Sequence, residues 1–476
     1  MSELQNRVCV IGAGSSGIAA CKTLKDHCIP FDCYESSDRV GGNWAYGNRN
    51  NMSSAYKSLF INTSKPRMQY SDYPMPESYP IFPHHTQVAE YFDSYVDHFH
   101  FRHHIRFNST VTGANPIDGG GWEIILQDGS VHNYRALLVA NGHHWDPRWP
   151  DPPFPGHFNG EVIHSHHYRV SDPYIDKKVL VLGFGNSAMD IAVETSHVSK
   201  MTYLGVRRGF HVIPKFLLGR PLDQSIFDGL LPNALLSRLL AIGLAIQVGK
   251  ITNYGLPKPD HSVMHAHPTV SSDILTRITH GRVQVKPNIR KLDGDGIIFE
   301  DDSREQIDCI IYCTGYNVTF PFFKPEVVEA KNNELLLFRR VFHPQYRDLF
   351  FIGLLQPLGA TMPIAELQSV WVSKFLLGEY ALPAQHEISQ NIRREREVLR
   401  KRFSDSPRHT MEVDVLPYVR SIKREMRRGA RRPGTATMVK QDFLVPDPVR
   451  QSRDCGIRRK AASDSDASRP LATTDT

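Results

Sequence analysis

The chain has 476 residues, of which 41% are hydrophobic and 22% charged, as in an ordinary globular protein with two or three domains. The net charge of +6 is too mild to indicate a nucleic-acid partner, and the seven cysteines form neither a zinc ribbon nor a CxxC redox motif. We expect no secretory signal, because the first residues enter a strand almost at once and lack a continuous apolar region. We expect no transmembrane helix, because polar residues and Pro232 interrupt the apolar stretch 229–249. That stretch fits a buried or half-buried helix, or one that rests on a membrane or lines substrate entry. A reducing, cytoplasmic setting fits best.

The first elements predict a dinucleotide site. Residues 7–11 read as a buried strand, a helix ends near His27, and residues 31–35 read as a second strand. Between the first strand and the helix lies a GxGxxG loop, Gly12-Ala13-Gly14-Ser15-Ser16-Gly17. Its glycines let backbone approach a pyrophosphate, and the helix start supplies N–H groups. Glu35, 18 residues beyond Gly17, stands where an acid binds a ribose hydroxyl.

The same pattern returns later in the chain. Residues 178–182 predict a strand, 189–197 a helix and 201–205 the next strand, and the turn is Gly183-Phe184-Gly185-Asn186-Ser187-Ala188. This is a GxGxxA variant of the same fingerprint. The strand is followed by Arg207 and Arg208, whose guanidinium groups offer bidentate bonds to a phosphate and favour NADPH over NADH. The alternative is that both are solvated loop charges.

Two further features repeat in register. A hairpin at 121–132 precedes a strand at 136–140 and then Gly142, and a hairpin at 294–306 precedes a strand at 308–313 and then Gly315. The glycine loops are offset by 171 positions (183 minus 12) and the closing glycines by 173 (315 minus 142). This duplication predicts an α/β fold with two Rossmann-like domains. The proline-rich stretch 147–155 marks a crossing between them.

Several motifs together resemble the flavin-containing monooxygenase family of class B flavoprotein monooxygenases, over the chain to about Tyr418. They are residues 34–36 with 39–44, the segment 62–65, the FxGxxxHxxx(F/Y) fingerprint at 158–168, the Thr-Gly-Tyr segment at 314–316, and 351–357. The resemblance implies FAD on the first loop and NADPH on the second. It adds Gly42, Asn43, Trp44, Asn62, Thr63 and Gln356 to the FAD contacts, and it gives Asn186, Ser187 and Arg207 to NADP.

The resemblance also implies the reaction. NADPH reduces the flavin, oxygen adds to give a hydroperoxide at carbon 4a, and one oxygen atom passes to a nitrogen- or sulfur-containing small molecule. Asn62 matches the family asparagine that stabilises this state, although the residue type is also a common turn former. The fingerprint residues Phe158, Gly160, His164 and Tyr168 lie at the domain crossing, where His164 has a conformational or structural part rather than that of a base.

Other functions stay open as alternatives. Baeyer–Villiger relatives, which convert ketones to esters, carry Trp where this chain has Tyr168, and this favours oxygenation of a heteroatom. A nonenzymatic flavin or NADPH sensor is a more remote alternative. A disulfide reductase is disfavoured, because the first helix lacks paired cysteines.

The resemblance divides the chain into a first part of the FAD domain (1–150), an NADPH domain (151–315), a second part of the FAD domain (316–428) and a disordered basic, polar tail (429–476). A helical insertion at about 209–253 faces substrate or membrane. The basic segments 393–402 and 423–432 are interrupted by Glu395, Glu397 and Glu425, so we expect solvated helix faces, with peripheral membrane contact a minor option. No metal site is expected, because the histidine groups 164–167 and 261–267 lack a ligand pattern. Nothing indicates the substrate's identity or the oligomeric state.

Overall fold

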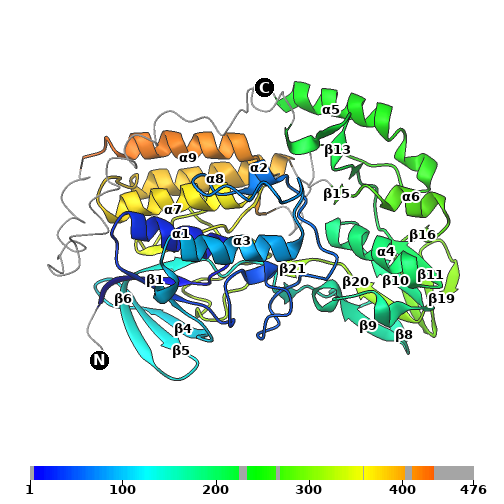
Figure 1. Cartoon of the computed structure of the whole chain (residues 1–476), viewed down its shortest axis with the longest axis horizontal. Coiled ribbons are helices and arrows are strands. Elements are labelled where there is room, and N and C mark those ends of the chain that lie inside the picture. Colours follow the sequence, from blue (N-terminus) through cyan, green and yellow to red (C-terminus); the bar gives the residue numbers. More distant parts are fainter. Residues whose placement is uncertain (1–4, 225–232, 264–268, 358, 403–409, 434–476) are drawn as a thin grey trace.

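Two α/β units lie side by side in the protein (Figure 1). The computed structural model describes residues 5–224, 233–263, 269–357, 359–402 and 410–433. The core of the first unit is built from residues 8–140 together with 318–422, whereas the second core draws mainly on residues 154–312. The first unit is therefore assembled from two separate stretches of chain, and the second is inserted between them.

The first unit is built on a seven-stranded sheet with the order β3-β2-β1-β6-β5-β4, and β22 pairs with β6. Strands β3, β2, β1, β6 and β22 run parallel, and β4 and β5 are antiparallel additions. The bounds are β1 (Gln5–Ile11), β2 (Phe31–Tyr34), β3 (Ile105–Arg106), β4 (Val111–Pro116), β5 (Trp122–Leu126), β6 (Val131–Val139) and β22 (Leu349–Phe351). We predicted that the hairpin at 121–132 and the strand at 136–140 are separate elements, whereas the second strand of the hairpin continues into the following strand as β6.

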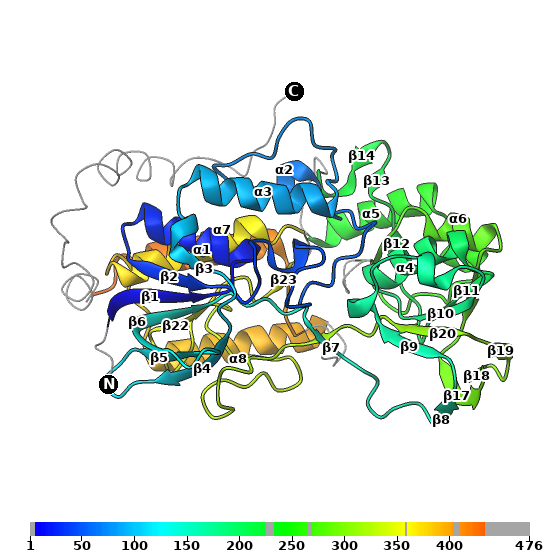
Figure 2. The same ribbon diagram turned by 60° about the horizontal axis from the view of Figure 1, so that its bottom comes forward.

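Helices cover the buried parallel strands of this sheet (Figure 2). They are α1 (Ser15–Asp26), α3 (His85–His98) and α7 (Met362–Leu376), and α1 packs against both others. The C-terminal helix α9 (Val415–Gly429) packs on α7, and α8 (Gln385–Arg402) precedes it. Residues 434–476, most of the predicted tail, lie outside the described residues.

The second unit repeats the plan with a five-stranded parallel sheet in the order β16-β11-β10-β20-β9. The bounds are β9 (Glu161–His164), β10 (Lys178–Leu182), β11 (Met201–Gly205), β16 (Val283–Lys286) and β20 (Cys309–Tyr312). Helices α4 (Asn186–Val198) and α6 (Ile274–Thr279) pack against it. A smaller sheet, β19-β18-β17-β8, contains the predicted second hairpin, with β8 (Gly156–Phe158), β17 (Ile289–Gly294), β18 (Gly296–Phe299) and β19 (Arg304–Gln306). The predicted α/β class with two Rossmann-like units is thus confirmed.

The chain crosses between the units twice, and the crossings pair with each other. Strand β7 (Asp146–Pro147) runs antiparallel to β21 (Tyr316–Asn317), and the Arg148 amide donates to the Gly315 carbonyl (3.0 Å). The proline-rich stretch after Pro147 then leads into β8. Both crossings therefore form one two-stranded hinge.

A long excursion follows β11. It contains β12 (Val212–Ile213), the hairpin of β13 (Phe216–Leu217) and β14 (Arg220–Pro221), and α5 (Asn233–Gln247). It rejoins the unit where β15 (Thr269–Val270) pairs with β12, so it extends beyond the predicted end near residue 253. Within the described ranges, no helix has the length and apolar character needed to cross a membrane.

Candidate cofactor and oxygenation site

The first glycine loop is closed too tightly for side chains. A Cβ on Gly12 would lie 2.7 Å from the Ala140 carbonyl oxygen, and one on Gly17 would lie 1.8 Å from the Gly12 carbonyl oxygen. Helix α1 begins directly after Gly14, and no side chain caps it. The loop therefore presents backbone N–H groups and the positive end of the α1 dipole, and its glycines place no side chain in front of them.

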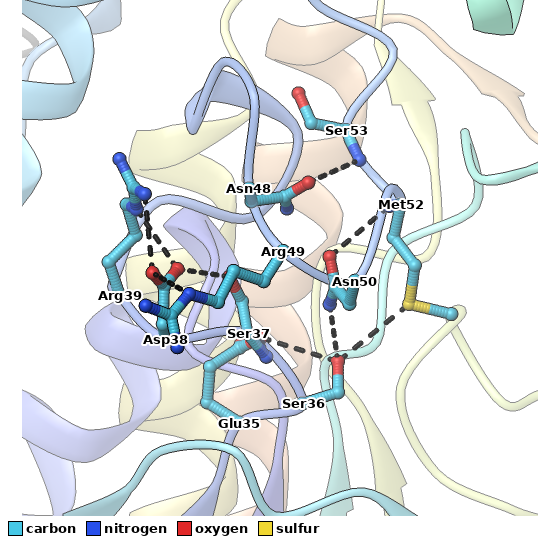
Figure 3. A network of polar contacts seen from close by, with 10 residues as sticks. All are labelled: Glu35, Ser36, Ser37, Asp38, Arg39, Asn48, Arg49, Asn50, Met52 and Ser53. Carbon is cyan, nitrogen blue, oxygen red and sulfur yellow. Dashed lines mark hydrogen bonds and ion pairs between the residues drawn. The ribbon is translucent and has the colours of Figure 1, made fainter.

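Glu35 closes this loop from the end of β2. Its side chain is 5% exposed, and its two oxygens accept hydrogen bonds from the amides of Ala13 (2.6 Å) and Ser37 (2.7 Å). Burial raises the pKa of the Glu35 carboxyl, against the lowering effect of these hydrogen bonds. A polar network extends from Glu35 through Ser36 to Asn50 (Figure 3).

The segment after this network approaches the loop. Gly42 has a positive φ of 54°, and a Cβ there would lie 3.0 Å from the Gly14 Cα. Trp44 is partly buried against the core. The Asn43 carboxamide oxygen accepts hydrogen bonds from the amide (2.8 Å) and the hydroxyl (2.7 Å) of Ser54, and the cofactor contact of Asn43 stays a prediction.

The second loop repeats the geometry of the first. A Cβ on Gly183 would lie 2.6 Å from the Cys313 carbonyl oxygen, just as a Cβ on Gly12 would lie close to the Ala140 carbonyl oxygen. Helix α4 begins after Gly185, and no side chain caps it. At its third position Ala188 is fully buried in the core. The Asn186 carboxamide oxygen accepts from the Val270 amide (2.8 Å), which ties β15 over the loop. Ser187 follows in the first turn of α4.

Arg207 and Arg208 stand beyond β11, as the sequence predicts, and a third cation joins them. Burial lowers the pKa of Arg207, and the nearby charges of Arg208 and Arg148 lower it further. Arg208 lies over the Phe184 ring (5.4 Å), and its Nε is buried without a hydrogen-bond partner. Among the described residues none of the three forms an ion pair. Asp260 carries the nearby negative charge, and its pKa is lowered by its hydrogen bond to His261 and by the charge of Arg208, but in the described portion of the chain it forms no ion pair with these cations. Mutual repulsion between cations without an ion pair among the described residues suits a bound phosphate. Arg148 was missed because it lies in the domain crossing, far from the loop in sequence.

Asn62 lies on a segment clamped between the two units. The Ile61 amide donates to the Pro83 carbonyl (3.0 Å), while Lys215 Nζ of the insertion donates to the Ile61 carbonyl (3.2 Å). Asp223 Oδ2 accepts from the Ser64 amide (2.6 Å). Asn62 and Thr63 are half-buried, and within the described parts of the chain the Asn62 carboxamide has no hydrogen-bond partner. The insertion therefore contacts the neighbours of the predicted catalytic residue on both sides, which no local pattern in the sequence indicates.

The fingerprint is divided between two places. Phe158 and Gly160 pack beside β17 and the Asp308 carbonyl, where a Cβ on Gly160 would lie 2.5 Å from that oxygen. Tyr168, in contrast, is 1% exposed and packs against Tyr56 at the contact between the units (6.0 Å between ring centroids). The four residues do not form one site.

His164 is held as a neutral ring at the hinge. It is fully buried, its Nδ1 accepts from the His166 amide (3.1 Å), and its ring meets Trp149 and Tyr316 edge-on. Burial lowers its pKa to about 4, and nearby His166 and His167 lower it too. A base so weak suits the structural part expected from the sequence better than proton transfer.

Gln356 begins β23 (Gln356–Pro357), which pairs with β24 (Glu412–Val413). The preceding Gly353 has a positive φ of 73°, and a Cβ there would lie 1.9 Å from Ser16 Oγ. Its amide donates to Gln368 of α7 (2.8 Å). Gly353 therefore lies against the start of α1, next to the first glycine loop, three residues before Gln356.

No cluster of three or more potential metal ligands occurs among the residues that the structure describes. Of the two histidine groups, His265 and His267 fall outside the described residues. His164 and His166 instead take part in the hinge.

Comparisons with known proteins agree with this geometry. Residues 5–442 match the family model "flavin-binding monooxygenase-like". Flavin-containing monooxygenase 5 of Rattus norvegicus is 37% identical over 440 residues, which cover 88% of this chain and 82% of the relative. S-allyl-L-cysteine S-oxygenase from Allium sativum is similar in structure, with a TM-score of 0.67, 23% identity and 88% of each chain covered. Cyclohexanone monooxygenase from Rhodococcus sp. Phi1, bound to NADP+, has a TM-score of 0.65 and 16% identity over 89% of this chain and 98% of its own.

Proposed function

The chain belongs to the flavin-binding monooxygenase-like family, and we propose from this premise which of its residues carry out the reaction. It is a flavoprotein monooxygenase that uses FAD and NADPH and oxygenates soft nitrogen or sulfur nucleophiles. The expected resemblance to flavin-containing monooxygenases is confirmed.

We assign FAD to the first unit and NADPH to the second. Uncapped helix starts at α1 and α4 suit the two pyrophosphates, and the positions of Gly12 and Gly183 leave room only for backbone. Glu35 suits a ribose hydroxyl, and the cluster of Arg148, Arg207 and Arg208 suits the additional phosphate of NADPH.

When bound, FAD supplies the oxygen-activating chemistry and NADPH the hydride. The chain's own residues bind and orient both cofactors. The Asn62 carboxamide can donate and accept hydrogen bonds, so it can hold an oxygen atom at the reacting centre without transferring a proton. The insertion covers this segment and restricts the entry of water.

The observation that carries the assignment is that Asn62, half-buried between the two units, has no hydrogen-bond partner for its carboxamide in the described part of the chain. The test is Asn62→Ala with NADPH, oxygen and a thioether. Loss of the proposed hydrogen bond from Asn62 to the reacting oxygen lowers sulfoxide formed per NADPH by roughly 10- to 100-fold, with hydrogen peroxide taking its place. Asn253→Ala, which removes an exposed asparagine of the insertion, serves as control. Unchanged sulfoxide yield in Asn62→Ala rejects the role of Asn62.

The same assay separates the alternative reactions. Offered the thioether, the proposed enzyme forms sulfoxide. Offered a cyclic ketone in its place, the proposed enzyme forms little ester, whereas a Baeyer–Villiger enzyme forms the ester as its main product. A flavin or NADPH sensor binds its cofactors and forms neither product.

We further propose that this protein is cytoplasmic and contacts an anionic membrane surface through α9 and α5. On α9 an uninterrupted exposed row is entirely basic and consists of Arg420, Lys423, Arg424, Arg427 and Arg428. Glu425, expected to interrupt this run, is 4% exposed and instead accepts hydrogen bonds from Tyr380 (3.1 Å) and Arg432 (2.7 Å). The spacing of the cations places them on one helix face.

Helix α5 adds an apolar row to the same side of the molecule. Four residues at helical spacing are exposed: Leu235 (44%), Leu239 (39%), Ile242 (57%) and Ile246 (73%). Both helices lie along the upper edge in Figure 1. A basic row and an apolar row along one edge suit an extended, flat, anionic partner with an apolar interior.

Cosedimentation with vesicles tests this contact. We expect binding to phosphatidylcholine vesicles containing phosphatidylserine and weaker binding to phosphatidylcholine alone. Lys423→Glu with Arg427→Glu weakens binding by roughly tenfold or more, because each surface cation contributes about 1 kcal/mol. The control is Arg393→Glu with Arg394→Glu on α8, where an exposed glutamate accompanies the cations. Equal binding to both kinds of vesicle, or none, rejects the contact.

A further inference from the structure

Two acids of helix α4 hold the chain just before Asn62. The Tyr56 hydroxyl donates to Asp190 Oδ2 (2.5 Å), and the Ser58 hydroxyl donates to Glu194 Oε2 (2.6 Å). Asp190 and Glu194 are one turn apart on the helix that starts at the proposed NADPH phosphate site. The segment that leads to Asn62 is thus fastened to the nucleotide-binding helix.

The insertion holds the same segment on both sides of Asn62. Lys215 donates to the Ile61 carbonyl, and Asp223 and Gln224 bind the amide (2.6 Å) and hydroxyl (2.9 Å) of Ser64. In both views α2 (Lys65–Met68), which follows this segment, lies on the side of the first unit that faces the insertion (Figures 1 and 2). Asn62 itself stays free of such contacts among the described residues.

Charged groups at this contact come with a free-energy cost that apolar packing would avoid. Tyr56 is 4% exposed, and burial raises the pKa of the Asp190 carboxyl to about 6. Burial also lowers the pKa of Lys215, although Asp190 and Asp273 oppose the shift. Apolar packing would hold the units together without removing water from Asp190 and Lys215, which are both half-buried, whereas directional hydrogen bonds fix the place of a segment. The contacts of Asp190 and Lys215 therefore suit the positioning of the segment that carries Asn62 better than simple cohesion between the units.

We propose that Asp190, acting through Tyr56, and Lys215, acting through the Ile61 carbonyl, are positioning residues that set the place of Asn62 relative to the nucleotide-binding helix. The proposal rests on the role assigned to Asn62 above. Its consequence is that the second unit controls how much NADPH ends in product. When the tether is lost, NADPH, oxygen and a proton give NADP+ and hydrogen peroxide, instead of oxygenated product and water.

The test compares Tyr56→Phe, Asp190→Ala and Asp190→Asn in the full chain. Tyr56→Phe removes one oxygen atom, so it spares the fold, and we expect a several-fold rise in hydrogen peroxide per NADPH with an NADPH KM within twofold of the wild type. Asp190→Ala has the same effect. The double variant Tyr56→Phe with Asp190→Ala forms no more hydrogen peroxide per NADPH than Asp190→Ala alone, because the two substitutions remove the same hydrogen bond. Asp190→Asn keeps an acceptor for the tyrosine and restores most of the coupling.

A second readout does not depend on turnover. In the protein without cofactors, amide hydrogen exchange over residues 57–64 is faster in Tyr56→Phe and Asp190→Ala than in the wild type. Tyr203→Phe is the matched control, because its hydroxyl donates to Glu305 (2.9 Å) in the same unit, away from Asn62. Unchanged exchange and unchanged peroxide in Tyr56→Phe overturn the positioning role while Asn62→Ala still uncouples. If Asn62→Ala does not uncouple, the role of Asn62 fails, and its positioning fails with it.

Discussion

The two dinucleotide units share a backbone plan and differ in the side chains placed on it. In both, the first two strands pair in parallel up to the glycine loop, with Ile11 opposite Tyr34 and Leu182 opposite Gly205. In both, a Cβ added to the first glycine would lie 2.6–2.7 Å from a backbone carbonyl oxygen at the end of a neighbouring strand. The shared plan provides a place for a pyrophosphate, because it depends on backbone alone.

The differences assign distinct tasks to the two units. An offset of 171 places Ala188 where the first unit has Gly17, and Asp190 where it has the fully buried Ala19. Beyond the second strand, the first unit has Glu35, whereas the second unit has Arg207 and Arg208. The first helix is thus packed wholly within its own unit, whereas the second turns acids toward the neighbouring unit.

The largest expected effect is at the third glycine. In Gly17→Ala the new Cβ meets the Gly12 carbonyl oxygen, so helix or loop must move, at roughly 1–3 kcal/mol or more. We expect purified Gly17→Ala to contain little or no flavin, as measured by the ratio of flavin to protein absorbance. Ala188→Gly changes the equivalent position by only about 1 kcal/mol of helix propensity and keeps NADPH binding. Full flavin content in Gly17→Ala contradicts the tight closure of the first loop.

The next effect concerns the cations. Arg207→Ala removes a charge-assisted hydrogen bond worth roughly 1.5–3 kcal/mol, so kcat/KM with NADPH falls by about 10- to 100-fold while that with NADH changes little. Arg148→Ala also lowers kcat/KM with NADPH relative to kcat/KM with NADH, but by a smaller factor. The measurement is the ratio of kcat/KM values for the two nucleotides. An equal loss with NADPH and NADH would falsify the phosphate contact.

The smallest effect is a dependence of stability on pH. The pKa of Asp190 is raised to about 6 in the folded protein, so the folded state holds this proton more tightly than the unfolded state. The contribution of Asp190 to stability is therefore greatest at low pH and falls as the pH rises towards about 6. Asp190→Asn does not titrate, so its Tm relative to the wild type increases between pH 5 and pH 7.5, by a few degrees. A difference in Tm that does not vary with pH counts against a raised pKa of the Asp190 carboxyl at this contact.

Local sequence was sufficient for the cofactor loops. Glycines, an uncapped helix start and the residue after the second strand lie within about 25 positions of one another, and phosphate binding needs those residue types at that spacing. The motifs were also sufficient for the family, now shown by comparison. The role of Asn62 and the individual cofactor contacts stay predictions.

Only the tertiary structure decided what surrounds Asn62. Tyr56 and Asp190 are 134 positions apart, and Ile61 and Lys215 are 154 apart, so their contacts depend on how one unit docks on the other. Arg148 joins the phosphate cluster for the same reason. On α9 the sequence shows an acid among cations, but burial of Glu425 removes it from the exposed face. The sequence by itself determined two dinucleotide sites because each is local, whereas docking of distant segments determined the chemistry between them.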